Sequence, residues 1–227
     1  MRTKEQIEEL EKTHGRPYAV HQCVDTDSLI DYYNANSGNI IHKNTGPKVL
    51  KIDKNHSLLQ PIIERMQKDL NPFTIRYAHF FDVTDPHIIH NDDEFEFPKS
   101  YKAFTIPLKI YGDSEDIKLV LFDQYYYGGP AKFFNGEKAI ENVYYNKPII
   151  EYSNVTCKNN KGIDEDFRKE YLGHLRNSWL DGLSIKDTLD WKVGDVLCFD
   201  SLSLHCSSNF RSKGIQRKIG LSIFTVL

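Results

Sequence analysis

The chain has 227 residues, 40% of them hydrophobic, and a formal net charge of −3. This length is enough to bury one sizeable core, so we expect a single domain over residues 1–227, with helical support over about residues 1–72 and a barrel core over about residues 73–227. The small acidic excess argues against a nucleic-acid partner, because domains that bind phosphates usually carry a basic excess.

Membrane insertion and secretion are not expected either. The sequence contains no long apolar run, and it does not open with a charged and then apolar leader. Its four cysteines form no Cys-x-x-Cys pair, which fits free thiols in a reducing compartment. We therefore expect a cytoplasmic protein without membrane contact.

Two helices are predicted in the N-terminal third. Thr3 and Gln6 form a capping-box pattern, which predicts a helix from about Lys4 to His14. A second apolar stripe predicts a helix over about Ser57–Leu70, with a proline near its first turn. Both helices are expected to brace a barrel from outside.

The remaining elements are mostly strands, since short runs rich in β-branched and aromatic residues alternate with turn residues. The predicted strands are Phe73–Phe81, Ala103–Tyr111, Ile117–Phe122, Pro148–Tyr152, Val196–Phe199 and Ile219–Val226. The segment Asp164–Leu183 predicts a helical insertion near the site. The simplest architecture is mainly β with flanking helices, a double-stranded β-helix of the jelly-roll or cupin-like type.

The first chemically informative segment is His90-Asn91-Asp92. Side chains two residues apart in an extended chain point to the same face, so His90 and Asp92 can bind one metal ion while Asp93 points away. The alternative is a solvated surface pair in the acidic run that continues to Glu94 and Glu96.

His205 is the candidate third ligand. It follows the apolar strand Val196–Phe199, after Asp200 and Ser201 interrupt the run, which places it at a strand edge or loop mouth. The alternative is a partly buried structural histidine. Two imidazoles and one carboxylate form the triad typical of non-haem Fe(II) sites, which leaves coordination positions for substrate and oxygen.

The closing strand separates two neighbouring cations. Alternation places Lys218 on one face together with Gly220, Ser222 and Phe224, and Arg217 on the other face, which is mostly aliphatic. Small and polar neighbours leave room for a ligand beside Lys218, which is therefore the first candidate for binding an anion. Arg217 is the second candidate, because a one-residue bulge would exchange the two faces.

With this order of residues, the chain resembles the Fe(II)- and 2-oxoglutarate-dependent oxygenases from about Phe73 to Leu227. The resemblance rests on His-x-Asp, a distant histidine preceded by an apolar strand, and a basic residue on the closing strand. It implies that His90, Asp92 and His205 are catalytic residues that bind Fe(II). It also implies that Lys218 or Arg217, together with Ser222, binds the distal carboxylate of 2-oxoglutarate.

One departure concerns the closing strand. Many family members have Arg-x-Ser or Arg-x-Thr there, whereas Ile219 follows Arg217 by two residues and Gly220 follows Lys218 by two residues. Tyr77 and His79, on one face of the strand before the metal pair, are further candidates for donating to the co-substrate, and Tyr77 is preferred.

The resemblance implies a dioxygenase that uses O2 to decarboxylate 2-oxoglutarate to succinate and carbon dioxide, coupled to hydroxylation. A carboxylate at Asp92 favours hydroxylation over halogenation, because related halogenases lack one at that position. The expected substrate is a small molecule, with an amino-acid or protein side chain as alternatives. Two other functions stay open: a cupin-type metal protein with a different reaction, and a non-catalytic jelly-roll binding module.

Overall fold

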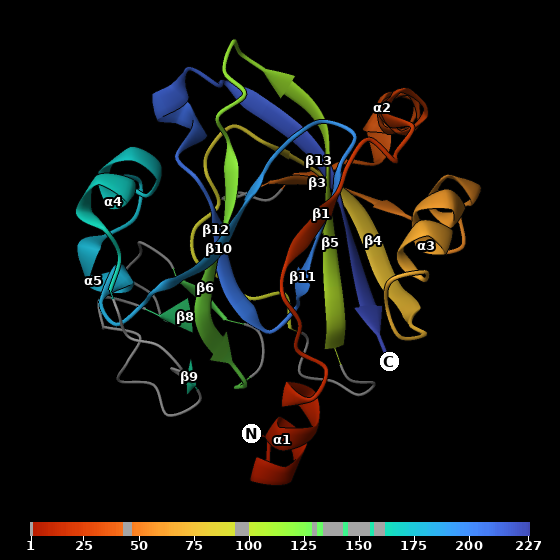
Figure 1. The fold of residues 1–227 in the computed structure, drawn as a ribbon. Coiled ribbons are helices and arrows are strands. Elements are labelled where there is room, and N and C mark those ends of the chain that lie inside the picture. The colour runs from red at the N-terminus through yellow and green to blue at the C-terminus, as the bar shows by residue number, and fades with distance from the viewer. Residues whose placement is uncertain are drawn as a thin grey trace.

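In a computed structural model of the protein, the described residues are 2–42, 47–93, 100–128, 131–133, 143–144, 155–156 and 162–227. The predicted strand Pro148–Tyr152 and the acidic residues Glu94 and Glu96 lie outside them. The described part of the chain is mainly β, with two antiparallel sheets that pack face to face (Figure 1). This confirms the predicted jelly-roll class.

The larger sheet has seven strands in the order β1-β11-β5-β13-β4-β3-β2. In chain order these strands are β1 (Tyr18–Val20), β2 (Ile41–His42), β3 (Lys48–Ile52), β4 (Thr74–Val83), β5 (Ser100–Tyr111), β11 (Val196–Asp200) and β13 (Arg217–Val226). The closing strand β13 lies between β4 and β5 and pairs with both along most of its length. The residues of β13 are therefore held on both sides by backbone hydrogen bonds.

The smaller sheet has the order β10-β6-β12, and β9 pairs with the end of β6. Its strands are β6 (Lys118–Tyr126), β9 (Val155–Thr156), β10 (Ile185–Asp190) and β12 (Ser203–Ser207). A separate parallel pair consists of β7 (Lys132–Phe133) and β8 (Val143–Tyr144). The strands β11 and β12 are joined by two residues, so the chain crosses from the larger to the smaller sheet just before His205.

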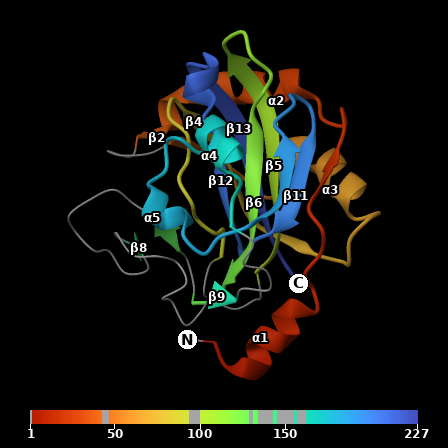
Figure 2. The same ribbon diagram turned by 60° about the vertical axis from the view of Figure 1, so that its left-hand side comes forward.

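Helices cover the outer face of each sheet. The helices α2 (Thr26–Ala35) and α3 (Gln60–Met66) pack on the larger sheet, where Leu29 and Met66 join a buried cluster with Phe80 and Ile223. The helices α4 (Glu165–Tyr171) and α5 (Asn177–Leu180) lie against the smaller sheet (Figure 2). Burying large apolar side chains on both outer faces leaves the surfaces between the sheets as the place for a site.

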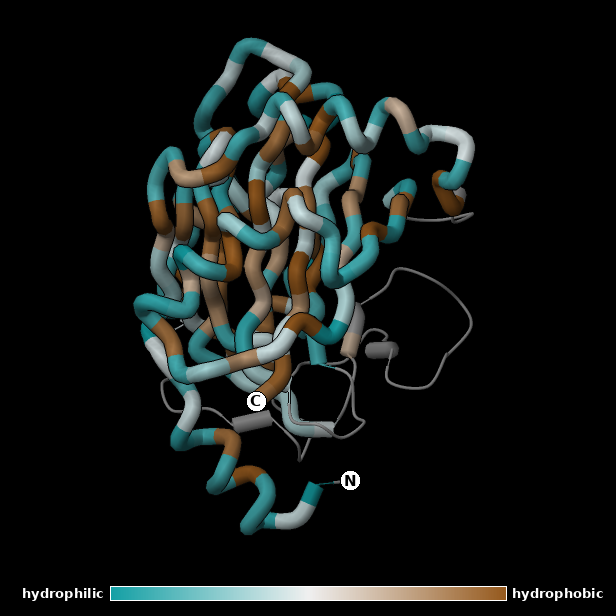
Figure 3. Tube along the Cα trace, turned by 90° about the vertical axis from the view of Figure 1, so that its right-hand side faces the viewer, coloured by the Kyte–Doolittle hydropathy of each residue, from teal (hydrophilic) through white to brown (hydrophobic). Residues whose placement is uncertain are grey.

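The helix α1 (Lys4–Glu11) lies at one end of the barrel (Figure 1). The hydropathy colouring shows the hydrophobic residues concentrated along the strands, whereas α1 carries mostly polar residues (Figure 3). Short 3-10 helices complete the described elements: Ser37–Asn39, Ser57–Leu59 and Phe210–Lys213. Among the described helices, none is long and apolar enough to cross a membrane.

Several predicted boundaries differ from the observed ones. The first helix has the predicted capping box of Thr3 and Gln6 but ends at Glu11 instead of His14. The second predicted helix begins as a 3-10 turn, continues as α3 and ends at Met66 instead of Leu70. The helix α2 was not predicted, although Asp25 provides its N-terminal cap by accepting from the Ser28 N–H.

The cysteines agree with the expected free thiols. Cys23, Cys198 and Cys206 form no disulfide, and Cys157 lies outside the described residues. Burial raises the pKa of both Cys198 and Cys206, which keeps these thiols protonated and suits packing better than metal binding.

Candidate metal centre

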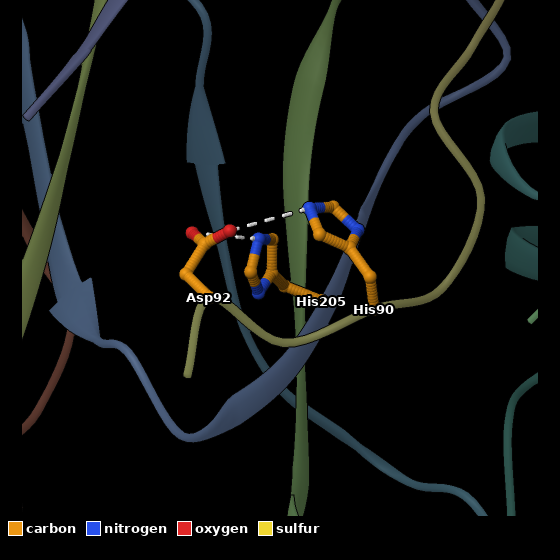
Figure 4. A group of neighbouring side chains, drawn as sticks. All are labelled: His90, Asp92 and His205. Carbon is orange, nitrogen blue, oxygen red and sulfur yellow. Dashed lines mark ion pairs between the residues drawn. The ribbon is translucent and has the colours of Figure 1, made fainter. Parts of the chain in front are cut away.

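The three predicted ligands come together between the sheets (Figure 4). The His90 N–H donates to the His205 carbonyl at 3.0 Å, and the His205 N–H donates back to His90 at 2.9 Å. Residues opposite each other in an antiparallel pair project to the same face, so both imidazoles point the same way. The Asp92 N–H donates to Ser201 at 2.8 Å, which holds Asp92 beside the end of β11.

The ligand atoms lie close enough to bind one ion. Asp92 Oδ1 is 3.6 Å from His90 Nε2, and Asp92 Oδ2 is 3.3 Å from His205 Nε2. One ligand atom from each of the three residues lies within 4.8 Å of the others. The solvated surface alternative for this segment is wrong, because the side chain of Asp92 is only 15% exposed.

Backbone carbonyls orient both imidazoles. His90 Nδ1 lies 2.8 Å from the Ile88 carbonyl, and His205 Nδ1 lies 2.9 Å from the Ser203 carbonyl. A carbonyl only accepts, so Nδ1 carries a proton in each ring, and Nε2 is the nitrogen through which the neutral ring would bind a metal. Both Nε2 atoms are the ones that face Asp92. The donor set therefore fits a divalent metal without any change of tautomer.

Asn91 anchors the segment between the two ligands. Its backbone N–H donates to Ala131, and its side chain accepts from the Ala131 N–H at 2.7 Å and donates to the Tyr126 carbonyl at 3.2 Å. Asn91 is buried, and these bonds join the metal segment to the end of β6 and the start of β7. The middle residue of the motif is therefore structural.

The electrostatics favour the ligand forms of the side chains. Burial, reinforced by the neighbouring His87 and His205, holds the pKa of His90 well below its ordinary value, so the ring is neutral. Burial on its own would raise the pKa of Asp92, but the facing His205 and His90 outweigh it and lower that pKa. Neutral imidazoles and an ionised carboxylate are the forms that bind a metal.

Lys218 is buried on the inner face of β13. Its Nζ lies 2.9 Å from Ser207 Oγ and sits over the rings of Trp191 and Phe210, with Nζ-to-centroid distances of 4.5 and 4.8 Å. Burial lowers its pKa to about 7. Within the described ranges, Lys218 forms no ion pair. Among these described residues, the ammonium group has one hydroxyl acceptor and two aromatic faces but no counter-anion.

Arg217 projects to the opposite face. Its guanidinium donates to both carboxylate oxygens of Asp82 at 2.7 and 2.9 Å, and the Tyr33 hydroxyl donates to the same carboxylate at 3.0 Å. Asp82 is 4% exposed, so this bidentate pair is a structural link between β13 and β4. The predicted alternation of the two cations is confirmed: Lys218 faces inward, and Arg217 has its partner on the helix-covered side.

The other predicted contacts lie further along the same face. Ser222 lies opposite His79, and Phe224 lies opposite Tyr77. His79 is close enough to Asp92 to help lower its pKa. The rings of Tyr77, His79 and Phe224 stack with centroid separations of 4.5–5.8 Å.

One expectation about space near Lys218 is wrong. Gly220 was expected to leave room for a ligand, but a Cβ at Gly220 would lie 2.4 Å from the ring of Phe81. The ring of Phe81 on the neighbouring strand β4 covers this glycine.

Ser207 was not singled out from the sequence. It follows His205 by two residues on β12, so alternation would have placed it on the ligand face. Alternation also places His79, two residues after Tyr77, on the ligand face, although Tyr77 was the preferred candidate for contacting the co-substrate.

No protein-family model matches the sequence, and no curated protein matches it. Among solved structures, the epimerase SnoN in complex with Fe3+, alpha ketoglutarate and nogalamycin RO has a TM-score of 0.54 at 9% identity, covering 98% of this chain and 82% of SnoN. The chain has the fold of the 2-oxoglutarate-dependent oxygenases. A second structure of SnoN, a non-heme alpha ketoglutarate dependent epimerase from nogalamycin biosynthesis, gives the same TM-score at 10% identity, with 98% and 81% coverage. HygX from Streptomyces hygroscopicus, with nickel, 2-oxoglutarate and hygromycin B bound, is less similar, with a TM-score of 0.49 at 10% identity over 99% of this chain and 87% of HygX.

Proposed function

We propose that this protein is an Fe(II)- and 2-oxoglutarate-dependent dioxygenase that hydroxylates a small molecule. The observation that carries the proposal is a facial triad of His90, Asp92 and His205 that faces the same interior as Lys218, a buried cation with no counter-anion among the described residues. The fold is that of SnoN, which binds Fe3+ and alpha ketoglutarate. A metal triad alone would fit many proteins, but a triad paired with a buried lysine fits a chelating dicarboxylate.

The co-substrate would lie between the triad and Lys218. Ser207, which accepts a hydrogen bond from Lys218, follows His205 by two residues, a distance of roughly 7 Å along the strand. This separation is close to the length of an extended five-carbon dicarboxylate. Lys218 and Ser207 would then bind the distal carboxylate, with the 2-oxo group and the near carboxylate directed at the triad.

The remaining predicted contacts would serve other parts of the site. Ser222 lies four residues from Lys218 on β13, roughly 13 Å away, and Tyr77 lies six residues from Val83, the partner of Lys218 on β4, roughly 20 Å away. One carboxylate cannot reach across these distances. We infer that Ser222 acts near the metal and that Tyr77 contacts the primary substrate.

The side chains divide the chemistry as follows. Bound Fe(II) would supply oxygen activation coupled to decarboxylation of 2-oxoglutarate to succinate and carbon dioxide. His90, Asp92 and His205 would hold three positions on one face, and Lys218 would neutralise the co-substrate and fix its orientation. Tyr77 and Phe224 would exclude water and orient the substrate C–H bond. The carboxylate of Asp92 favours hydroxylation over halogenation.

Anaerobic reconstitution tests this function. Fe(II) followed by 2-oxoglutarate should produce the weak visible charge-transfer band of the chelate. The band should be absent in the His205→Ala protein and should need a higher 2-oxoglutarate concentration in the Lys218→Ala protein. With oxygen and ascorbate, the protein should release succinate above an enzyme-free control, and N-oxalylglycine should suppress the release.

The outcomes separate the alternatives. Iron binding without 2-oxoglutarate binding would support a cupin-type metal protein, and binding of neither would support a non-catalytic module. A metabolite screen with a succinate readout then identifies the substrate, and a protein or amino-acid side chain would be recognised in the same assay with peptide pools. Hydroxylation adds the mass of one oxygen atom to the substrate. A product without this added mass would indicate another reaction that uses Fe(II) and 2-oxoglutarate.

A further inference from the structure

A buried ion pair joins the start of the chain to the metal segment. Arg2 donates from its two terminal guanidinium nitrogens, Nη1 and Nη2, to the two carboxylate oxygens of Asp93, with distances of 2.5 and 2.9 Å. The side chain of Asp93 is fully buried, and that of Arg2 is 10% exposed. Arg2 also donates to the Tyr127 carbonyl at 3.4 Å. A bidentate, desolvated pair of this kind is strongly oriented.

The pair lies directly beside a metal ligand. Asp92 and Asp93 are adjacent, with the Asp92 carboxylate facing the two histidines and the Asp93 carboxylate facing Arg2. On the other side of Asp92, Asn91 is fixed by its bonds to Ala131 and Tyr126. Asp92 is therefore held between two anchored neighbours, and the second anchor is supplied by Arg2.

The N-terminal segment is itself attached firmly. The capping box of α1 follows Arg2 directly, and Leu10 of α1 is buried against Tyr125, Tyr127 and Leu202. His14 stacks on Tyr125 with a centroid distance of 4.0 Å and an interplanar angle of 10°. Arg2 thus begins a segment whose position the barrel already fixes.

A second attachment point reaches Asp92 from β11. The Gly15 N–H donates to the Asp200 carboxylate at 3.1 Å, and Lys102 donates both to Asp200 and to the Thr13 carbonyl. Asp200 immediately precedes Ser201, whose carbonyl accepts from the Asp92 N–H. The N-terminal segment therefore contacts the surroundings of Asp92 at both ends. Arg2 contacts Asp93, which follows Asp92, and Gly15 contacts Asp200, which precedes Ser201.

We propose that Arg2 and Asp93 are positioning residues that set the orientation of the Asp92 carboxylate for metal binding. This inference rests on the proposed metal site. Arg2 donates to Asp93 and to the Tyr127 carbonyl, so it would act on Asp92 through the backbone of Asp93. Outer partners that orient metal ligands typically contribute 10- to 100-fold in metal affinity.

The test is a Co(II) titration followed by visible absorption, with the affinity tag on the exposed C-terminal residue Leu227 so that Arg2 is undisturbed. Arg2→Gln and Asp93→Asn should each raise the Co(II) dissociation constant about 10- to 100-fold and alter the ligand-field spectrum. The double variant should be no weaker than either single one, because the two residues act as a unit. Arg2→Lys keeps the positive charge but cannot make the bidentate contact, so its Co(II) affinity should lie between those of Arg2→Gln and the wild type.

The matched control is Arg16→Gln. Arg16 belongs to the same N-terminal segment, but its side chain is 87% exposed and it pairs at 3.3 Å with Asp187, a residue outside the metal segment. The Co(II) affinity and the ligand-field spectrum of the Arg16→Gln protein should equal those of the wild type. This comparison separates positioning of Asp92 from general attachment of the segment.

A folded Arg2→Gln protein with wild-type affinity and spectrum would overturn the inference. If that variant does not fold, the isosteric Asp93→Asn protein decides by the same criterion. Wild-type protein that binds Co(II) no better than His205→Ala would overturn both the inference and the proposed function. Wild-type protein that binds Co(II) but not 2-oxoglutarate would overturn the proposed function alone, and the Arg2→Gln titration would still decide the inference.

Discussion

Lys218 Nζ and Ser207 Oγ lie 2.9 Å apart, joining the closing strand of the larger sheet to the strand of the smaller sheet that carries His205. The contact crosses the interior of the barrel, and its cation has aromatic rings on two sides instead of a carboxylate. A buried ammonium group of this kind lowers the stability of the fold, which is expected when its partner is a ligand.

Lys218→Met should therefore have opposite effects on stability and binding. Removing the buried charge should raise the free energy of unfolding at pH 7 by about 1–4 kcal/mol. The dissociation constant for 2-oxoglutarate should rise at least about 30-fold, which corresponds to 2 kcal/mol. Denaturant unfolding and titration of the charge-transfer band measure the two quantities. If the variant is less stable and keeps its affinity for 2-oxoglutarate, Lys218 is not part of the co-substrate site.

The stability difference should also depend on pH. The pKa of Lys218 in the folded state, about 7, lies below that of an unfolded lysine. The unfolded chain therefore binds more protons between about pH 7 and pH 10, and the wild type becomes more stable over that range. The advantage of Lys218→Met should be complete below about pH 7 and decrease as the pH rises toward 10. Unfolding curves at several pH values measure it.

Binding of 2-oxoglutarate should weaken in alkaline solution. The carboxylate binds protonated Lys218, so the apparent dissociation constant should be constant below about pH 7 and rise by up to tenfold per pH unit above it. Anaerobic titrations of iron-loaded protein measure this dependence. In Lys218→Arg the guanidinium stays charged, and the pH dependence should disappear. The same slope in both proteins would assign it to another group.

Arg217→Met should lower the stability of the fold without weakening the binding of 2-oxoglutarate. It leaves the buried carboxylate of Asp82 without its bidentate partner, and we expect a loss of about 1–3 kcal/mol in the free energy of unfolding. The dissociation constant for 2-oxoglutarate should stay within about twofold of the wild type, since Arg217 lies on the other face of β13. A large rise in that constant without loss of stability would make Arg217 the anchor.

The metal ligands should be separable from other histidines. His90→Ala, Asp92→Ala and His205→Ala should each weaken Fe(II) binding by more than about 100-fold, because losing even an outer partner costs 10- to 100-fold. His21→Ala is the control, since His21 pairs with Asp195 and its side chain is 69% exposed. Calorimetric titration with anaerobic Fe(II) measures the affinities, and equal losses in all four variants would argue against this triad.

Local geometry made part of the site predictable. The same-face relation of His90 and Asp92, and the separation of Lys218 from Arg217, follow from the two-residue period of an extended backbone, which is present in any four-residue window. The strands β4, β5, β6, β11 and β13 were predicted in nearly the observed places, because each carries a continuous apolar or β-branched run. The helix α2 was missed, since its mixed composition buries only Leu29 and Tyr33.

The tertiary structure determines which charged residues pair. Nothing near Arg217 in the sequence indicates Asp82, and nothing near Asp93 indicates Arg2, which is 91 residues away. These partners depend on which strands become neighbours and in what register, and that choice is made by burial of the whole apolar surface. The sequence alone therefore supplies the ligand types and the face on which each lies. The tertiary structure alone decides which of the two cations is available for a ligand. Within the described part of the chain, packing brings a carboxylate to Arg217, whereas Lys218 meets a hydroxyl and two aromatic rings.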